Sequence, residues 1–232
     1  MANGDIPAPA DFDGDGKTDY AAFRPADGSW HILYSGTGTV GTISFGAAGD
    51  IPVPGDYDGD GKTDYALFRP AEGKWHILKS SNFSEALLQF GAIGDIPVPG
   101  DYDGDGITDH AVFRPSNGSW YALLSSTGAS VAQSLWQTGD IPAPADFDGD
   151  GKTDYAAFRP ADGSWHILYT STGTVGTISF GAAGDIPVPG DYDGDGKADA
   201  AVFRPTDGTW YVLQSSTSAW IIQPLWSAGD IP

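Results

Sequence analysis

The chain has 232 residues, with 31 acidic residues against 11 lysines and arginines, no cysteine and a formal net charge of -20. A charge of this sign argues against nucleic acid as a partner. The absence of cysteine excludes a thiol nucleophile. No apolar run approaches the length of a membrane span, so we expect no membrane insertion.

The first recognisable element is an acidic loop, DFDGDGKTD, at residues 11–19. The same nine-residue pattern occupies 56–64, 101–109, 146–154 and 191–199, at an interval of 45 residues. With four aspartates in each copy, the five loops hold 20 of the 31 acidic residues, and the other 11 match the 11 basic residues. The net charge is therefore confined to these loops. One such loop is typical of a solvated acidic turn, but five copies predict cation binding.

The spacing of the aspartates suits calcium, which takes flexible oxygen ligands, better than magnesium, which keeps waters and strict octahedral geometry. Positions 1, 3, 5 and 9 supply carboxylates and position 7 supplies a main-chain carbonyl. We expect five calcium ions per chain. The predicted ligands are the carboxylates of Asp11, Asp13, Asp15, Asp19, Asp56, Asp58, Asp60, Asp64, Asp101, Asp103, Asp105, Asp109, Asp146, Asp148, Asp150, Asp154, Asp191, Asp193, Asp195 and Asp199, and the carbonyls of Lys17, Lys62, Ile107, Lys152 and Lys197.

An EF-hand loop begins in the same way but needs a bidentate glutamate at position 12. That position is apolar in all five copies: Ala22, Leu67, Val112, Ala157 and Val202. The residues after each loop, such as TDYAAFRP, form a short aromatic run closed by proline, which is typical of a strand. Both observations exclude the EF-hand.

The rest of the chain repeats with the loop. A period of 45 residues predicts one supersecondary unit per repeat, and its length suits a propeller blade of four strands. In the second repeat we expect an innermost strand around Pro52 and Pro54, which remove amide donors from one edge, then strands at 65–69, 74–79 and 86–91. The predicted fold is all-β: a single-domain, five-bladed β-propeller over residues 1–232, with four-stranded antiparallel blades.

This pattern resembles the FG-GAP or VCBS repeats of integrin-α-type calcium-binding β-propellers. The resemblance spans essentially the whole chain and is most specific in the DxDxDGxxD loop followed by a short apolar strand. It implies a calcium loop between the first two strands of each blade and residence outside the cell. Integrin-type propellers usually have seven longer blades, so the number five comes from the repeats of this sequence.

Residues 4–62 and 139–197 are identical except at two positions, Ser35 against Thr170 and Gly36 against Ser171. Such near-identity predicts recent amplification from a long natural array, or deliberate construction. A further alternative for the function is therefore an ancillary domain excised from a larger secreted repeat protein, or an engineered repeat propeller. MANGDIP contains no signal peptide, and we expect a lost leader rather than a cytoplasmic location. Calcium sites of extracellular modules bind weakly and depend on the abundant calcium outside cells. The predicted location is therefore extracellular or at the cell surface.

Three further series recur once per repeat. We expect the arginine of FRP and the aspartate of GDIP to form an ion pair between blades, and the tryptophan of the third strand to lie in the core. The histidines His31, His76 and His166 follow that tryptophan as scaffold residues. No nucleophile, base and oxyanion donor combine, so we expect no enzymatic activity. The tryptophan series is Trp30, Trp75, Trp120, Trp165 and Trp210.

Two classes of function remain. The first is a calcium-stabilised adhesion or protein-interaction scaffold whose partners bind the rim loops. The second is a multivalent lectin, in which the unrepeated Trp136, Trp220 and Trp226 offer stacking surfaces for sugars. We expect a monomer in either case.

Overall fold

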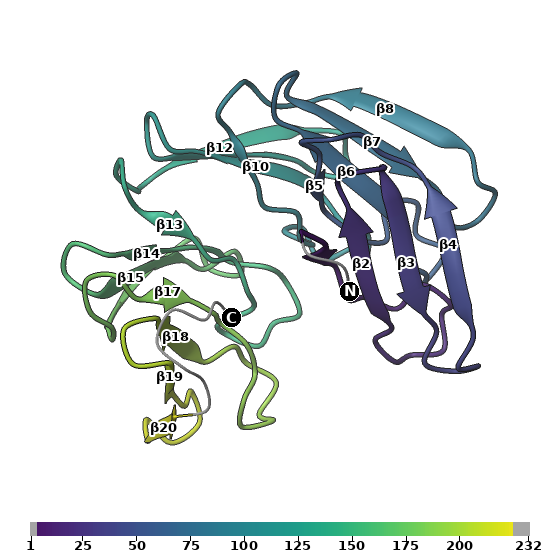
Figure 1. The fold of residues 1–232 in the computed structure, drawn as a ribbon. Coiled ribbons are helices and arrows are strands. Elements are labelled where there is room, and N and C mark those ends of the chain that lie inside the picture. Colours follow the sequence, from purple (N-terminus) through teal and green to yellow (C-terminus); the bar gives the residue numbers. More distant parts are fainter. Residues whose placement is uncertain (1–3, 225–232) are drawn as a thin grey trace. The chain divides into compact units, whose positions relative to one another are not determined.

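A computed structural model describes residues 4–224, in which each repeat forms one four-stranded antiparallel sheet (Figure 1). The five sheets are the blades of a β-propeller. The prediction of an all-β fold with five blades is therefore confirmed. No helix that could cross a membrane occurs among the described residues.

The strands follow the same order in every repeat. The innermost strands are β1 (Ile6–Pro7), β5 (Ile51–Pro52), β9 (Ile96–Pro97), β13 (Ile141–Pro142) and β17 (Ile186–Pro187). The second strands are β2 (Tyr20–Arg24), β6 (Tyr65–Arg69), β10 (His110–Arg114), β14 (Tyr155–Arg159) and β18 (Ala200–Arg204). The third strands are β3 (Ser29–Leu33), β7 (Lys74–Leu78), β11 (Ser119–Leu123), β15 (Ser164–Leu168) and β19 (Thr209–Leu213). The fourth strands are β4 (Val40–Ser44), β8 (Glu85–Gln89), β12 (Ser130–Ser134), β16 (Val175–Ser179) and β20 (Trp220–Pro224).

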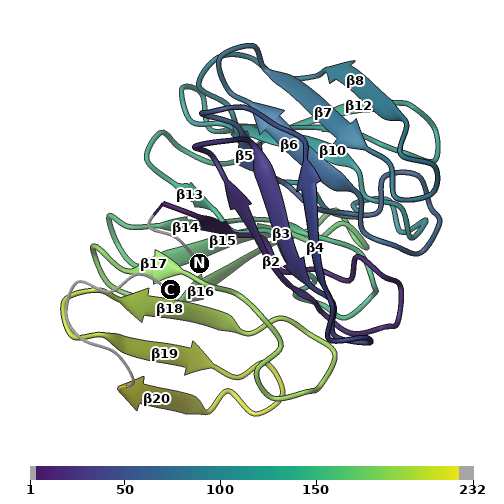
Figure 2. The ribbon, with the colours of Figure 1, turned by 45° about the vertical axis from the view of Figure 1, so that its right-hand side comes forward.

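Pairing within a blade follows chain order, and Figure 2 shows β17, β18, β19 and β20 side by side. The innermost strand has only two residues because its prolines cannot donate to a ladder. In the second blade, Ile51 pairs with Phe68 and Pro52 with Leu67, after which Val53 N donates to Ala66 O at 2.9 Å. The strand predicted at 65–69 is confirmed. The third strand ends one residue earlier than expected, and the fourth covers 85–89 instead of 86–91.

The second strand of a blade is buried on both faces. In β6, Ala66, Leu67 and Phe68 are fully buried, whereas the outer strand β8 alternates between exposed and partly buried residues. Such alternation is typical of a strand with one face toward solvent. The apolar residue that replaces the EF-hand glutamate, Leu67, therefore belongs to the core.

The recurrent tryptophan forms the centre of each blade's core, as predicted. Trp30, Trp75, Trp120 and Trp165 are fully buried, and Trp210 is partly buried. Trp165 lies 5.5 Å from the ring centre of Phe158, its partner across β14 and β15, and its Nε1 donates to Phe180 O at 2.9 Å. Aromatic pairs of this kind contribute beyond their buried area.

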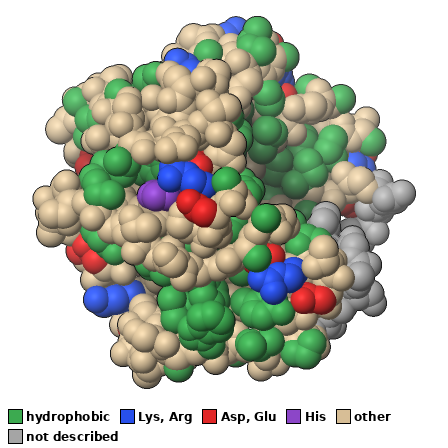
Figure 3. Space-filling view, turned by 90° about the vertical axis from the view of Figure 1, so that its left-hand side faces the viewer, with side chains coloured by type: hydrophobic (Ala, Val, Ile, Leu, Met, Phe, Trp, Pro, Cys, Tyr) green, Lys and Arg blue, Asp and Glu red, His purple; other side chains and the backbone are tan. Residues whose placement is uncertain are grey.

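The recurrent arginine and aspartate pair inside one blade in the first, second, fourth and fifth repeats, so the expected ion pair between blades is wrong there. Each arginine ends the second strand, and each aspartate precedes the innermost strand that pairs with it. The guanidinium remains partly exposed, and in Figure 3 a basic side chain lies directly beside an acidic one. The pairs are Asp5–Arg24 at 2.9 Å, and Asp50–Arg69, Asp140–Arg159 and Asp185–Arg204 at 2.8 Å.

We expect Arg69→Met to lower the free energy of unfolding by about 2 kcal/mol, the scale of hydrogen bonds to a charged group. Arg69 donates from Nε and Nη2 to Asp50, whose carboxylate is 1% exposed and would lose its bidentate partner. Urea denaturation measures the change. The control is Glu72→Gln, since Glu72 contacts the same arginine at 3.6 Å but is 41% exposed. A loss below about 0.5 kcal/mol, the range of ordinary surface substitutions, would contradict the prediction.

The described chain forms two compact units, and their boundary runs through the third repeat. One unit contains the residues up to Pro99 with Asp105–Val112 and Tyr121–Val131. The other contains Gly100–Gly104, Phe113–Trp120 and the residues from Ala132 onward.

Candidate metal centres

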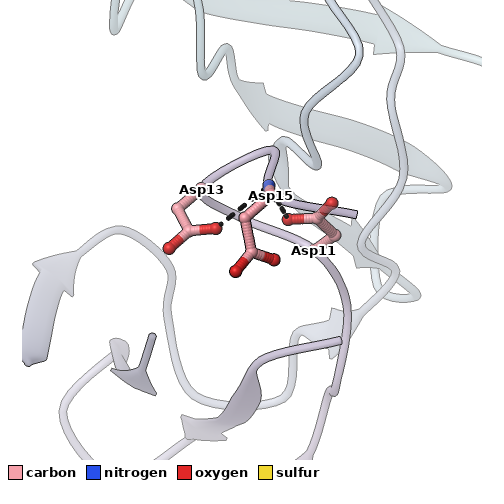
Figure 4. A group of neighbouring side chains, drawn as sticks. All are labelled: Asp11, Asp13 and Asp15. Atoms are coloured by element: carbon pink, nitrogen blue, oxygen red, sulfur yellow. Dashed lines mark hydrogen bonds between the residues drawn. The ribbon is translucent and has the colours of Figure 1, made fainter. Parts of the chain in front are cut away.

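Each acidic loop lies between the innermost and second strands of its blade and is folded around its first aspartate. Asp11 Oδ1 accepts hydrogen bonds from Gly14 N at 2.7 Å and Asp15 N at 3.2 Å, and its Oδ2 accepts from Gly16 N at 2.8 Å. Gly14 and Gly16 have φ of +78° and +81°, which side chains disfavour. In Figure 4 the Asp15 amide bonds the carboxylates of Asp11 and Asp13. The glycines therefore allow the carboxylates to gather.

Three aspartates of each loop offer ligand oxygens within 4.8 Å of one another. In the first loop these are positions 1, 3 and 5, and in the other four loops they are positions 1, 3 and 9. The groups are Asp11, Asp13 and Asp15; Asp56, Asp58 and Asp64; Asp101, Asp103 and Asp109; Asp146, Asp148 and Asp154; Asp191, Asp193 and Asp199.

The position 9 aspartate is the buried member of the group. Asp64 is 0% exposed, and its oxygens accept hydrogen bonds from Tyr57 N at 3.0 Å and Ser80 N at 2.7 Å. Burial raises the pKa of the Asp64 carboxyl despite these bonds, and it raises the pKa of Asp154 in the same way. A bound cation would offset this cost of keeping a buried carboxylate charged.

The position 3 aspartate supplies the test of whether a cation fits. Ser81 Oγ donates to Asp58 Oδ2 at 2.6 Å, while Asp58 Oδ1 is buried and has no hydrogen-bond partner. Asp148 shows the same arrangement, with Ser171 Oγ on Oδ2 and a buried, unpartnered Oδ1. Buried carboxylate oxygens without partners are costly unless a cation is bound. The oxygen-only donor set matches a hard cation.

The position 5 aspartate leaves the close group in four of the five loops. The Asp60 oxygens accept from Ser80 Oγ, both at 3.1 Å, and Asp195 Oδ2 accepts from Ser215 Oγ at 2.8 Å. In the first loop it is Asp19, at position 9, that lies outside the group. The position 7 residue donates its amide to position 5, as Lys62 N does to Asp60 Oδ1 at 2.9 Å. The complete set of four carboxylates and one carbonyl per loop stays a prediction.

Sequence reasoning missed the hydroxyl groups that contact these loops. They come from the turn between the third and fourth strands, 20 to 23 residues after the aspartates that they bind. Ser80, Ser81, Ser171, Ser215 and Ser216 are examples. The serine that recurs at this turn was the available sequence signal for these contacts. It could not be distinguished from an ordinary turn residue.

Successive loops are joined through their main chains. Thr63 N donates to Asp11 O at 2.8 Å and Thr108 N to Asp56 O at 2.7 Å in one unit. In the other unit Ala198 N donates to Asp146 O at 2.6 Å. A Cβ on Gly14 would lie 2.9 Å from Lys62 Cγ, so the close approach of two loops also requires glycine. Each loop therefore positions the next.

A serine, a histidine and an aspartate do meet in the first and fourth blades. The hydroxyl of Ser29 donates to Asp27 Oδ1, and its Oγ lies 2.9 Å from His31 Nε2. The hydrogen bond from the Ser29 hydroxyl lowers the pKa of the Asp27 carboxyl. The serine proton is directed to the carboxylate and not to the imidazole, the reverse of what nucleophilic catalysis requires. Asp162, Ser164 and His166 repeat the cluster.

The unrepeated tryptophans differ in exposure. Trp136 is 5% exposed, donates from Nε1 to His166 O at 2.9 Å and lies against Trp120, so it cannot stack on a sugar. Trp220 is 65% exposed and touches Phe180 edge-on. Trp226 lies outside the described residues.

Comparisons with known proteins agree with this geometry. A model of the FG-GAP-like repeat matches residues 11–67 and 146–202, and each match begins at the first aspartate of a loop. No curated protein sequence matches the chain.

Similar solved structures include three proteins of different function. One is a lectin of Agrocybe aegerita that recognises non-reducing terminal N-acetylglucosamine, with 17% identity and a TM-score of 0.64 over 98% of this chain and 68% of that chain. Another is an inactive virginiamycin B lyase of Staphylococcus aureus with quinupristin, with 10% identity and a TM-score of 0.63 over 95% and 69%. The third is regucalcin, a calcium-binding protein of Agrobacterium tumefaciens, with 15% identity and a TM-score of 0.57 over 93% and 73%.

These identities are low, so the solved structures establish the fold alone. The matched segments, by contrast, include the acidic loop and the strand that follows it. The chain is therefore a five-bladed β-propeller that contains FG-GAP-like repeats.

Proposed function

We propose that this chain is a non-catalytic β-propeller that binds one calcium ion in each acidic loop and serves as a scaffold for adhesion or protein interaction. The observation that carries this proposal is the pair of buried, unpartnered carboxylate oxygens, Asp58 Oδ1 and Asp148 Oδ1, inside groups of three aspartates. These are oxygens that the fold holds in place and leaves without a proton donor. A divalent cation is the partner that this chemistry favours.

Calcium suits the site better than magnesium. The ligands sit on a glycine-containing loop and include several carboxylates, whereas magnesium retains waters and demands near-ideal octahedral geometry. When bound, each ion would neutralise two of the four loop charges. Five ions would reduce the formal charge from -20 to -10.

The test is the metal content of the purified chain after dialysis against calcium. We expect one calcium per loop, and Asp58→Asn should remove about one ion per chain because it removes a charged ligand of the second loop. Elemental analysis and calorimetric titration measure the number. Glu85→Gln is the matched control, since it removes one acidic charge from β8, outside the loops.

Retention of all ions by Asp58→Asn would show that this carboxylate is not a ligand. Fewer than one calcium per chain in the unchanged protein would contradict the proposed function as a whole.

We also propose that the protein works outside the cell. Extracellular calcium modules bind their ion with dissociation constants of about 10⁻⁴ to 10⁻³ M, so such sites are filled outside cells and empty in a cytosol. The measured dissociation constants test this directly. Values below about 10⁻⁷ M would instead indicate sites that fill inside the cell.

The proposal that the chain lacks catalytic activity rests on repetition. The Asp27–Ser29–His31 cluster recurs in the fourth blade and directs its serine proton to a carboxylate. Broad esterase, glycosidase and phosphatase screens should show no turnover above background. Turnover that is abolished by Ser29→Ala or Ser164→Ala would overturn this view.

A glycan-binding function is the second candidate, and one pocket favours it. A pocket of about 430 Å³ in the first unit is lined by Tyr57, Leu88, His110 and Leu123, among others. His110 Nε2 is buried without a hydrogen-bond partner, and burial lowers the pKa of His110 to about 4. A neutral imidazole nitrogen can accept a hydrogen bond from a sugar hydroxyl.

A glycan array separates the two candidates. If the pocket binds sugar, His110→Tyr should abolish the signal, because tyrosine is the residue at this position in β6 and β14 and would fill the space. Calcium content should be unchanged in that variant. An array without signal, or one that His110→Tyr leaves intact, rules out this pocket as a glycan site.

A further inference from the structure

The two nearly identical segments of this chain form a natural matched pair. Residues 4–62 and 139–197 differ only at Ser35 against Thr170 and Gly36 against Ser171. Both differences lie in the turn that contacts the acidic loop. Despite this identity, the close group contains positions 1, 3 and 5 in the first loop and positions 1, 3 and 9 in the fourth.

The difference at Gly36 accounts for this change. A Cβ on Gly36 would lie 2.6 Å from Asp15 Oδ2 and 3.3 Å from Asp13 Oδ2, so the Asp15 carboxylate occupies space that a side chain would take. In the fourth blade Ser171 fills that space, and its hydroxyl holds Asp148 Oδ2. Asp148 Oδ1 is buried without a partner, whereas Asp13 Oδ1 accepts a bond from Asp15 N at 3.2 Å and Asp193 Oδ1, in the fifth loop, accepts one from Asp195 N at 3.3 Å. The feature that sets the first loop apart is therefore the missing serine bond to Oδ2, not the state of Oδ1.

The residue before Gly36 does not explain the change. Ser35 has serine equivalents in the second and fifth blades, Ser80 and Ser215, and both of those loops group positions 1, 3 and 9. The residue at the position of Gly36, in contrast, differs between the first loop and the other four, as the grouping of the aspartates does. It is glycine in the first blade and serine in the others, at Ser81, Ser126, Ser171 and Ser216.

We propose that this turn position sets the calcium affinity of the loop beneath it, and that the first loop is the weakest of the five sites. This inference rests on the proposed function and deepens it. Ser81, Ser171 and Ser216 act as positioning residues, since each donates a hydrogen bond to the position 3 carboxylate. The first loop lacks that bond.

The physical reason is preorganisation. A charge-assisted bond from the serine hydroxyl fixes one carboxylate oxygen and leaves the other free for the ion. Without it, the Asp13 carboxylate must be ordered when the ion binds. Loss of a partner that orients a ligand typically weakens metal binding by about 10- to 100-fold.

The experiment exchanges the two residues in the full chain and titrates calcium by calorimetry. The unchanged protein should show four tight sites and one site about 10-fold weaker. Gly36→Ser should give five tight sites, and Ser171→Gly three tight and two weak. Asp11→Asn, which removes a ligand from the first loop, should delete the weak site and leave the four tight sites.

Further variants separate the hydroxyl from its bulk. Ser171→Ala keeps the Cβ and should weaken the fourth site, whereas Ser171→Thr keeps the hydroxyl and should retain a tight site. Ser35→Thr introduces the other residue by which the fourth blade differs from the first. It should leave four tight calcium sites and one weak site. Far-UV circular dichroism at saturating calcium shows that each variant folds, so a shift confined to calcium affinity identifies positioning rather than structural damage.

Five equal sites in the unchanged protein, or swaps that leave the affinity classes unchanged, would overturn this inference and leave the proposed function standing. No calcium binding by any variant would overturn both. The inference is supported if the unchanged protein has four tight sites and one weak site, Gly36→Ser makes all five tight, and Ser171→Gly makes two weak.

Discussion

Removal of calcium is expected to lower the melting temperature of this protein steeply. An ion present at a hundred times its dissociation constant adds roughly 2.7 kcal/mol per site to the folded state. Five independent sites without affinity for the unfolded chain would give about 13 kcal/mol as an upper bound, which equals the whole stability of many domains. The effect is expected to be large because the loops concentrate the entire net charge of the chain.

Scanning calorimetry with calcium, with a chelator and with excess magnesium measures this dependence. Magnesium should restore little of the lost melting temperature, because the loops do not provide a rigid octahedral site. Raised salt should recover part of it by screening the loop carboxylates from one another. An unchanged melting temperature in chelator, together with less than one calcium per chain, would identify the loops as plain acidic turns.

The second large effect is expected in the core. Trp165→Ala should lower the free energy of unfolding by about 3–5 kcal/mol, since Trp165 is fully buried and truncation leaves a cavity beside Phe158. It also leaves Phe180 O without the indole donor that bonds it at 2.9 Å. Trp165→Phe should lose less, because it retains most of the ring and forfeits mainly that hydrogen bond.

Urea denaturation at saturating calcium measures these changes separately from metal loss. Trp220→Ala is the control, because that tryptophan is 65% exposed at the edge of the fifth blade. If Trp165→Ala and Trp220→Ala cost the same, the recurrent tryptophan would not be the centre of the blade core.

The regular part of this molecule could be predicted from the sequence because one local pattern repeats. The 45-residue repeat, its prolines and its short aromatic runs placed the strands of the second blade within one or two residues. The burial of Trp75 followed from its fixed place in a repeated strand. Each of these features depends on residues close together in the sequence.

Features that depend on distant residues were missed or misplaced. The partner of Arg69 was expected in another blade, but antiparallel pairing of β5 with β6 brings Asp50 of the same repeat beside it. The hydroxyl of Ser81 reaches Asp58 across 23 residues, which no local pattern indicates. The different grouping in the first loop depends on the space beside Gly36, which only coordinates reveal.

The main-chain hydrogen bond between successive loops has a consequence for the evolution of the array. Thr63 and Ala198 make the same bond through their amides, although their side chains differ. Side chains such as Phe12 and Tyr65 also meet between successive repeats, but hydrogen bonds from backbone groups at a fixed place in each repeat suit any copy as a neighbour. A blade can therefore be duplicated or deleted by unequal recombination without a new interface having to arise, and nearly identical copies such as 4–62 and 139–197 can stand apart in one chain.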